Sequence, residues 1–193
     1  MNEQPKLFML LLGCKPKGRH TEQHDIFFTI SLRLADAITS IIDFWAEAKG
    51  DIHVDAWRDI RNVDGYKIEI VNSDNDVPSS EEKLSRLYFI NLGGYKPGEF
   101  EEFHYKMIVV APDKGDAIRQ SKQTAFYKHT GFKGATSHVD DKYGIDVDDV
   151  HAIEDILPEE IKKKYRIRIS PNDTGEQDDL HMGYFNLEKL RSL

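Results

Sequence analysis

Two pairs of residues in the first third of the chain have the types and spacing that could do chemistry: Glu22 with His24, and His53 with Asp55. In each pair the residues are two positions apart, which places both side chains on one face of a strand. If the two strands are neighbours, two imidazoles and two carboxylates converge. Such a set suits zinc, manganese or iron, and it could also act as a general acid and base.

The same kinds of residue return later in the chain, and we align the first set with Glu102, His104, His138 and Asp140. All eight residues are candidate ligands of a divalent metal, and the first four are candidate catalytic residues. A structural alternative stays open, in which His24 and Asp55, or His53 and Glu22, hydrogen-bond across the sheet and fix its register. Duplication favours the structural role, because an enzyme seldom needs two equal active sites in one chain.

The alignment rests on an internal repeat in a chain of 193 residues. Residues 7–48 align without a gap to residues 87–128, and the shared positions include the glycines of Gly13-x4-Gly18. A five-residue insertion then changes the offset from 80 to 85, which sets His53 against His138. The repeat resumes in order, so the sequence predicts a duplicated domain.

Hydrophobic periodicity predicts the same elements in each copy. Residues 7–12 and 26–30 read as strands, residues 34–48 as an amphipathic helix, and residues 53–57 and 66–71 as two more strands. The predicted fold class is α+β, with two tandem β-β-α-β-β repeats related by pseudo-twofold symmetry. A helix and strand follow as a C-terminal extension.

The domain boundaries follow from these elements. We predict a first repeat over residues 1–71, a polar linker over 72–85, a second repeat over 86–157 and an extension over 158–193 that packs on the repeats. In the extension, Pro158 should open a helix that ends at Lys164, and a strand should follow it.

The order of these motifs resembles one known family. The G-x4-G turn, the Glu-x-His pair, the amphipathic helix, and the His-Val-Asp-x-Trp segment followed by Val-Asp-Gly-Tyr together look like the bacterial Domain of Unknown Function 1543 family. Its members contain one or two copies of this unit, and the resemblance implies two copies between residues 7 and 157. It implies an uncharacterised protein and supplies no activity.

The two copies differ where a ligand could lie between them. The first has Trp57 and Tyr66 at positions that we align with Lys142 and His151, so these four are candidate binding residues. We expect a non-catalytic module that binds an unknown small molecule or protein. The alternative is a metal-dependent or acid–base enzyme of hydrolase type that uses a Glu-x-His plus His-x-Asp cluster.

Other patterns narrow the function classes. Gly13-x4-Gly18 has the spacing of a phosphate-binding loop, but Arg19 and His20 stand where that loop needs lysine and a hydroxyl residue, so we expect a plain turn. The acidic residues 140–141 and 146–149 lack the pattern of a calcium loop, and we expect solvated turns there.

Composition sets the remaining expectations. A formal net charge of −8 argues against a nucleic-acid partner. The sequence has no run as long as a membrane-spanning helix and no signal peptide, and Cys14 is its single cysteine, so we expect a cytoplasmic protein, monomeric or homodimeric.

Overall fold

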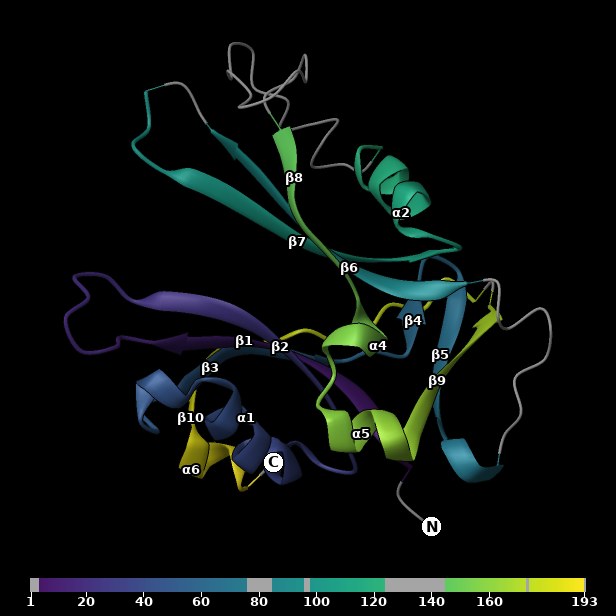
Figure 1. The fold of residues 1–193 in the computed structure, drawn as a ribbon, viewed down its shortest axis with the longest axis horizontal. Coiled ribbons are helices and arrows are strands. Elements are labelled where there is room, and N and C mark those ends of the chain that lie inside the picture. Colours follow the sequence, from purple (N-terminus) through teal and green to yellow (C-terminus); the bar gives the residue numbers. More distant parts are fainter. Residues whose placement is uncertain (1–3, 76–84, 96–97, 124–144, 173, 193) are drawn as a thin grey trace. The chain divides into compact units, whose positions relative to one another are not determined.

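The structure is a computed structural model, and it describes residues 4–75, 85–95, 98–123, 145–172 and 174–192. The chain divides into two compact units. Unit 1 contains residues 1–77 and 157–193, and unit 2 contains residues 78–156. Both units mix small antiparallel sheets with short helices (Figure 1). The C-terminal segment therefore belongs to the same unit as the N-terminal one.

A four-stranded antiparallel sheet forms the body of unit 1, with the strand order β10-β3-β1-β2. β1 and β2 make the hairpin that the two apolar runs predict. Gly18 lies in its turn at a φ of 87°, which only glycine adopts without strain. The bounds of the strands are β1 (Lys6–Cys14), β2 (Gln23–Ser31), β3 (His53–Asp59) and β10 (His181–Asn186).

Helical segments cover one face of this sheet (Figure 1). The amphipathic run predicted as one helix is divided into η1 (Leu34–Ala37), α1 (Ile38–Phe44) and η2 (Ala46–Ala48). Trp45 separates the last two, because its backbone leaves the helical region at φ −121° and ψ 63°. The core on this face contains alternate residues of β1, buried residues of the helices and Leu190 of the short α6 (Leu187–Leu190). The residues between them on β1, Gly13 included, face the opposite side.

Unit 1 has a second, three-stranded sheet with the order β4-β5-β9. β5 (Tyr66–Asn72) pairs with the two-residue β4 (Asn62–Val63) and with β9 (Tyr165–Pro171), so that Ile68 lies opposite Ile169. η3 (Ser73–Asn75) follows β5, and α5 (Glu159–Lys164) precedes β9 as predicted. The C-terminal segment thus supplies one strand to each sheet of unit 1.

Unit 2 contains one three-stranded sheet with the order β7-β6-β8. Its core combines residues of the sheet with Ala117 of α2, a helix whose N-terminus is capped by the Asp113 side chain, 2.9 Å from the Asp116 amide nitrogen. The bounds are β6 (Arg86–Tyr95), β7 (Glu102–Ala111), α2 (Lys114–Ser121), β8 (Ile145–Ala152) and α4 (Ile153–Ile156).

The central strands of the two units share one pattern of pairing. In unit 1, Gly13 of β1 pairs with His24 of β2 and with His53 of β3, and a bulge in β3 leaves Asp55 without a partner in the register. In unit 2, Gly93 of β6 pairs with His104 of β7 and with Asp146 of β8, and a bulge at the same place leaves Asp148 as the extra residue.

This register corrects the alignment made from the sequence. Gly93 lies 80 positions after Gly13, but Asp146 lies 93 positions after His53 (146 − 53), so the offset after the helix is 93 and not 85. The acidic residues 146–149 are part of β8 rather than a solvated turn. His138, Asp140 and Lys142 lie outside the described residues. His151 occupies the position of Arg58, not that of Tyr66.

Across the described ranges, each helix is too short or too polar to span a lipid bilayer.

Candidate functional site

The two residue pairs, Glu22 with His24 and His53 with Asp55, meet in unit 1 on the sheet face opposite the helical core. His24 and His53 flank Gly13 on either side of β1, because both pair with it in register. Glu22 comes just before β2, and Asp55 is the bulge residue of β3. Short contacts connect these four side chains, which we call the unit 1 cluster (Glu22, His24, His53 and Asp55).

The contacts of the unit 1 cluster alternate imidazole and carboxylate around a ring. His24 Nε2 lies 3.1 Å from Asp55 Oδ2 and 3.8 Å from Glu22 Oε2. His53 Nε2 lies 3.1 Å from Glu22 Oε1 and 3.3 Å from Asp55 Oδ1. Each carboxylate therefore turns one oxygen toward each imidazole, and both imidazoles contact the carboxylates through Nε2.

None of these four contacts has the geometry of a hydrogen bond among the described residues. Asp55 Oδ2 is buried and has no hydrogen-bond partner, although it lies 3.1 Å from His24 Nε2. The structural alternative, in which imidazole donates to carboxylate across the sheet, requires aligned donors. A buried carboxylate oxygen without a partner is costly, so a cation or a protonated imidazole that paired with it would stabilise this group.

Gly13 leaves the space in which the unit 1 cluster lies. A Cβ atom at this position would collide with the His53 imidazole and would stand 2.8 Å from Asp55 Oδ2. The backbone of Gly13 has no positive φ, so the reason for glycine here is the close approach of these two side chains. The backbone of β1 at Gly13 therefore lies in direct contact with the side chains of the cluster.

The C-terminal strand covers one side of the unit 1 cluster. The Tyr184 ring of β10 stacks on the His53 ring, with centroids 4.4 Å apart and planes at 29°. The His53 side chain is only 9% exposed, whereas Glu22 is 46% and His24 is 43% exposed. The cluster is thus closed at His53 and open to solvent at Glu22 and His24.

A smaller group occupies the same position in unit 2. His104 Nε2 lies 3.3 Å from Asp148 Oδ2 and 3.8 Å from Glu102 Oε2. We call these three residues the unit 2 cluster (Glu102, His104 and Asp148), and all of them are exposed. The sequence predicted Glu102 and His104 but not Asp148. A signal for it existed, because Val147-Asp148 and the buried Ile153 repeat Val54-Asp55 and Ile60 at the offset of 93.

Three of the four predicted binding residues, Trp57, Tyr66 and His151, are within the described residues. Trp57 stacks face to face on His181 of β10, with ring centroids 3.8 Å apart, and packs edge-on against Phe8. Tyr66 lies in the other sheet of unit 1, opposite Val63 and Pro171. His151 of unit 2 is exposed on β8. Trp57 and Tyr66 therefore belong to different sheets of unit 1.

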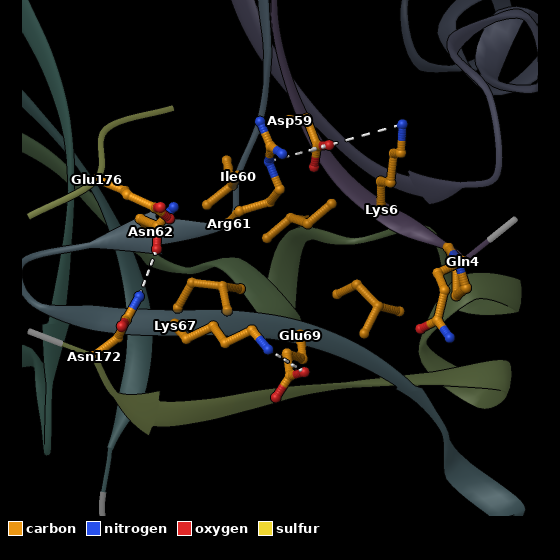
Figure 2. A pocket seen from close by; sticks show the side chains of 14 residues that line it. Gln4, Lys6, Asp59, Ile60, Arg61, Asn62, Lys67, Glu69, Asn172 and Glu176 are labelled. Carbon is orange, nitrogen blue, oxygen red and sulfur yellow. Dashed lines mark hydrogen bonds and ion pairs between the residues drawn. The ribbon is translucent and has the colours of Figure 1, made fainter. Parts of the chain in front are cut away.

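Unit 1 also has a hollow of about 370 Å³ between its sheets (Figure 2). Lys6 and Arg61 approach Asp59 there, at 3.9 and 3.6 Å. Burial raises the pKa of the Asp59 carboxyl, against the opposing pull of Arg61 and Lys6. Lys67 pairs with Glu69 at 2.8 Å, and Asn172 donates to Asn62. Most polar groups of this hollow are therefore paired within the protein.

Comparison with known proteins gives a match to a family model over part of the chain and a similar fold in a solved structure. A model of the Domain of Unknown Function (DUF1543) matches residues 19–70, a segment that contains all four residues of the unit 1 cluster. The crystal structure of protein Il1583 from Idiomarina loihiensis is similar, with a TM-score of 0.63 at 20% identity. The similarity covers 95% of this chain and 97% of that one. None of the curated proteins matches the chain.

Proposed function

We propose that this chain is a binding protein whose ligand is a divalent transition-metal ion, held in unit 1 by His24 and His53 together with Glu22 and Asp55. The observation that supports this best is the ring of imidazole and carboxylate contacts without hydrogen-bond geometry, in which Asp55 Oδ2 is buried and unpartnered. Imidazole suits zinc and iron, and carboxylate suits manganese, so the mixed set fits this class of ion.

The spacing of the cluster supports the proposal. At a metal–ligand distance of about 2.1 Å, neighbouring ligand atoms lie about 3.0 Å apart in an octahedron and about 3.4 Å apart in a tetrahedron. The neighbours in the ring lie 3.1, 3.1, 3.3 and 3.8 Å apart. Among the described residues, only Glu102, His104 and Asp148 have ligand atoms that all lie within 4.8 Å of one another. An ion in the unit 1 cluster would therefore have to draw the side chains closer together, and it would neutralise the two carboxylates.

The exposure of Glu22 and His24 provides a route for the ion to enter and leave. His53 is held by the Tyr184 ring and by the backbone at Gly13, so one ligand is fixed before binding. The fixed imidazole loses little freedom on binding, whereas the other three side chains must become ordered around the ion. This arrangement favours binding, and we assign no reaction to it.

We further propose that the two units arose by duplication of one β-β-α-β core. The shared pairing of Gly13 and Gly93, each with a histidine on one side and a bulge on the other, supports this origin.

Cys14 is buried and unpaired, which fits the reducing environment of a cytoplasmic protein.

The experiment is calorimetric titration of the untagged, chelator-treated chain with Zn²⁺ and with Mn²⁺. His53→Ala and Asp55→Asn should each weaken binding at unit 1 by about 100-fold or more, since even loss of an outer partner of a ligand costs 10–100-fold. Asn keeps the shape and an acceptor oxygen, so a structural hydrogen bond would tolerate it. His20→Ala, an exposed histidine in the adjacent turn, is the matched control. Unchanged affinity in both cluster variants would refute the proposal.

A further inference from the structure

The unit 2 cluster brings one imidazole and two carboxylates to a single point. The candidate ligand atoms of Glu102, His104 and Asp148 all lie within 4.8 Å of one another, which is close enough for one ion to touch all three. Their side chains are between 29% and 38% exposed, so an ion can reach them from solvent.

The backbone of unit 2 is adapted to this group. A Cβ atom on Gly93 would collide with the carboxylate of Asp148, so the carboxylate lies directly over the central strand. His104 pairs with the same glycine from β7, and the bulge in β8 supplies Asp148 from the other side. Bulges of this kind turn a side chain toward a site. Three separate strands of backbone thus converge on the cluster.

We infer that Glu102, His104 and Asp148 form a second divalent-cation site, weaker and richer in oxygen than the unit 1 cluster. It shares no residue with the unit 1 cluster, so it does not depend on the function proposed above. Three protein ligands leave more positions to water than four do, which lowers affinity and speeds exchange. One imidazole with two carboxylates also shifts preference from Zn²⁺ toward Mn²⁺ compared with unit 1.

The two sites should differ in the protons that they release. An imidazole must be neutral to bind a metal, so binding in mildly acidic solution displaces one proton for each imidazole that was protonated. Unit 1 offers two imidazoles and unit 2 offers one. Repeating a titration in buffers of different ionisation enthalpy counts these protons, and this readout separates a metal site from nonspecific attraction to acidic groups.

The test is titration of the full chain with Mn²⁺ and Zn²⁺ in four forms: the natural sequence, His53→Ala, His104→Ala and Asp148→Asn. We expect two sites in the natural chain, with unit 2 at least about tenfold weaker. His104→Ala and Asp148→Asn should each remove the weaker site only, and His53→Ala should remove the tighter one only. Glu99→Gln, which removes an exposed carboxylate before β7, is the matched control.

The outcomes separate the two proposals. Loss of the tighter site in His53→Ala, together with loss of the weaker site in His104→Ala and Asp148→Asn, supports both. A chain that binds only at unit 2 refutes the proposed function and supports this inference. A chain whose binding is unchanged by His104→Ala and by Asp148→Asn refutes this inference. Circular dichroism of each variant identifies unfolding, and Asp148→Asn, which preserves shape, decides the matter if His104→Ala unfolds.

Discussion

The clusters of unit 1 and unit 2 share a backbone arrangement and differ in what is added to it. Both have a glycine in the central strand, a histidine on one neighbour and a bulged aspartate on the other. Unit 1 adds His53, where unit 2 has Asp146, and β10 lies beside β3. In the described part of unit 2, β8 is an edge strand. One backbone arrangement can therefore carry a half-closed cluster or an open one.

The difference in exposure follows from the added strand. β10 brings Tyr184 over His53, which leaves the His53 side chain 9% exposed, whereas His104 of unit 2 is 35% exposed. A ligand held by packing loses less freedom on binding than an exposed one. The C-terminal segment, which lies outside the segment that matches the family model, therefore sets how closely the unit 1 cluster is held.

The largest effect should come from adding a methyl group to the central-strand glycine beside each cluster. In Gly13→Ala the added methyl group collides with His53 and crowds Asp55, so unit 1 should lose about 100-fold or more in Zn²⁺ affinity while unit 2 is unchanged. Gly93→Ala should do the reverse through Asp148. Titration of both variants measures this. Equal weakening of both units by either variant would show that the two clusters are not independent.

A smaller effect should come from removing the aromatic cover. Tyr184→Ala deletes the ring stacked on His53, so the imidazole gains freedom and unit 1 should bind Zn²⁺ about tenfold more weakly. Unit 2 should be unaffected. Met182→Ala, on the same strand and 74% exposed, is the control. The explanation of the difference between the units fails if Tyr184→Ala binds like the natural chain.

The smallest effect concerns a carboxylate that only unit 1 has. Asp59 takes the register position that Ala152 takes in unit 2. Because burial raises the pKa of Asp59 in the folded protein, its stabilising contribution is present in acid and is lost as the pH rises through the raised value. Asp59→Asn should remove this loss, so the free energy of unfolding of the variant, relative to the natural chain, should rise with pH.

Urea unfolding followed by tryptophan fluorescence measures this effect in the right place, because both tryptophans of the chain, Trp45 and Trp57, lie in unit 1. Asp74→Asn, an exposed residue of η3, is the control. A difference between Asp59→Asn and the natural chain that stays constant from about pH 4 to pH 7 would contradict the burial of a charged carboxylate at this position.

Much of the local structure could be predicted from the sequence. The apolar run before Gly13, the turn at Gly18 and the alternation of polar and apolar residues in β5 and β9 each depend on neighbours in the chain. The prediction of one long helix was wrong at Trp45, where the backbone leaves the helical region and the side chain packs, partly buried, against the core.

The sequence by itself determined that Glu22, His24, His53 and Asp55 would share a strand face in pairs, because side chains of a strand alternate. Only the tertiary structure decided that the two pairs flank one glycine, that Asp148 is the partner of His104, and that Tyr184 covers His53. The physical reason is that pairing between strands joins residues far apart in the chain. A bulge or a longer connection changes the register without leaving a periodic signal.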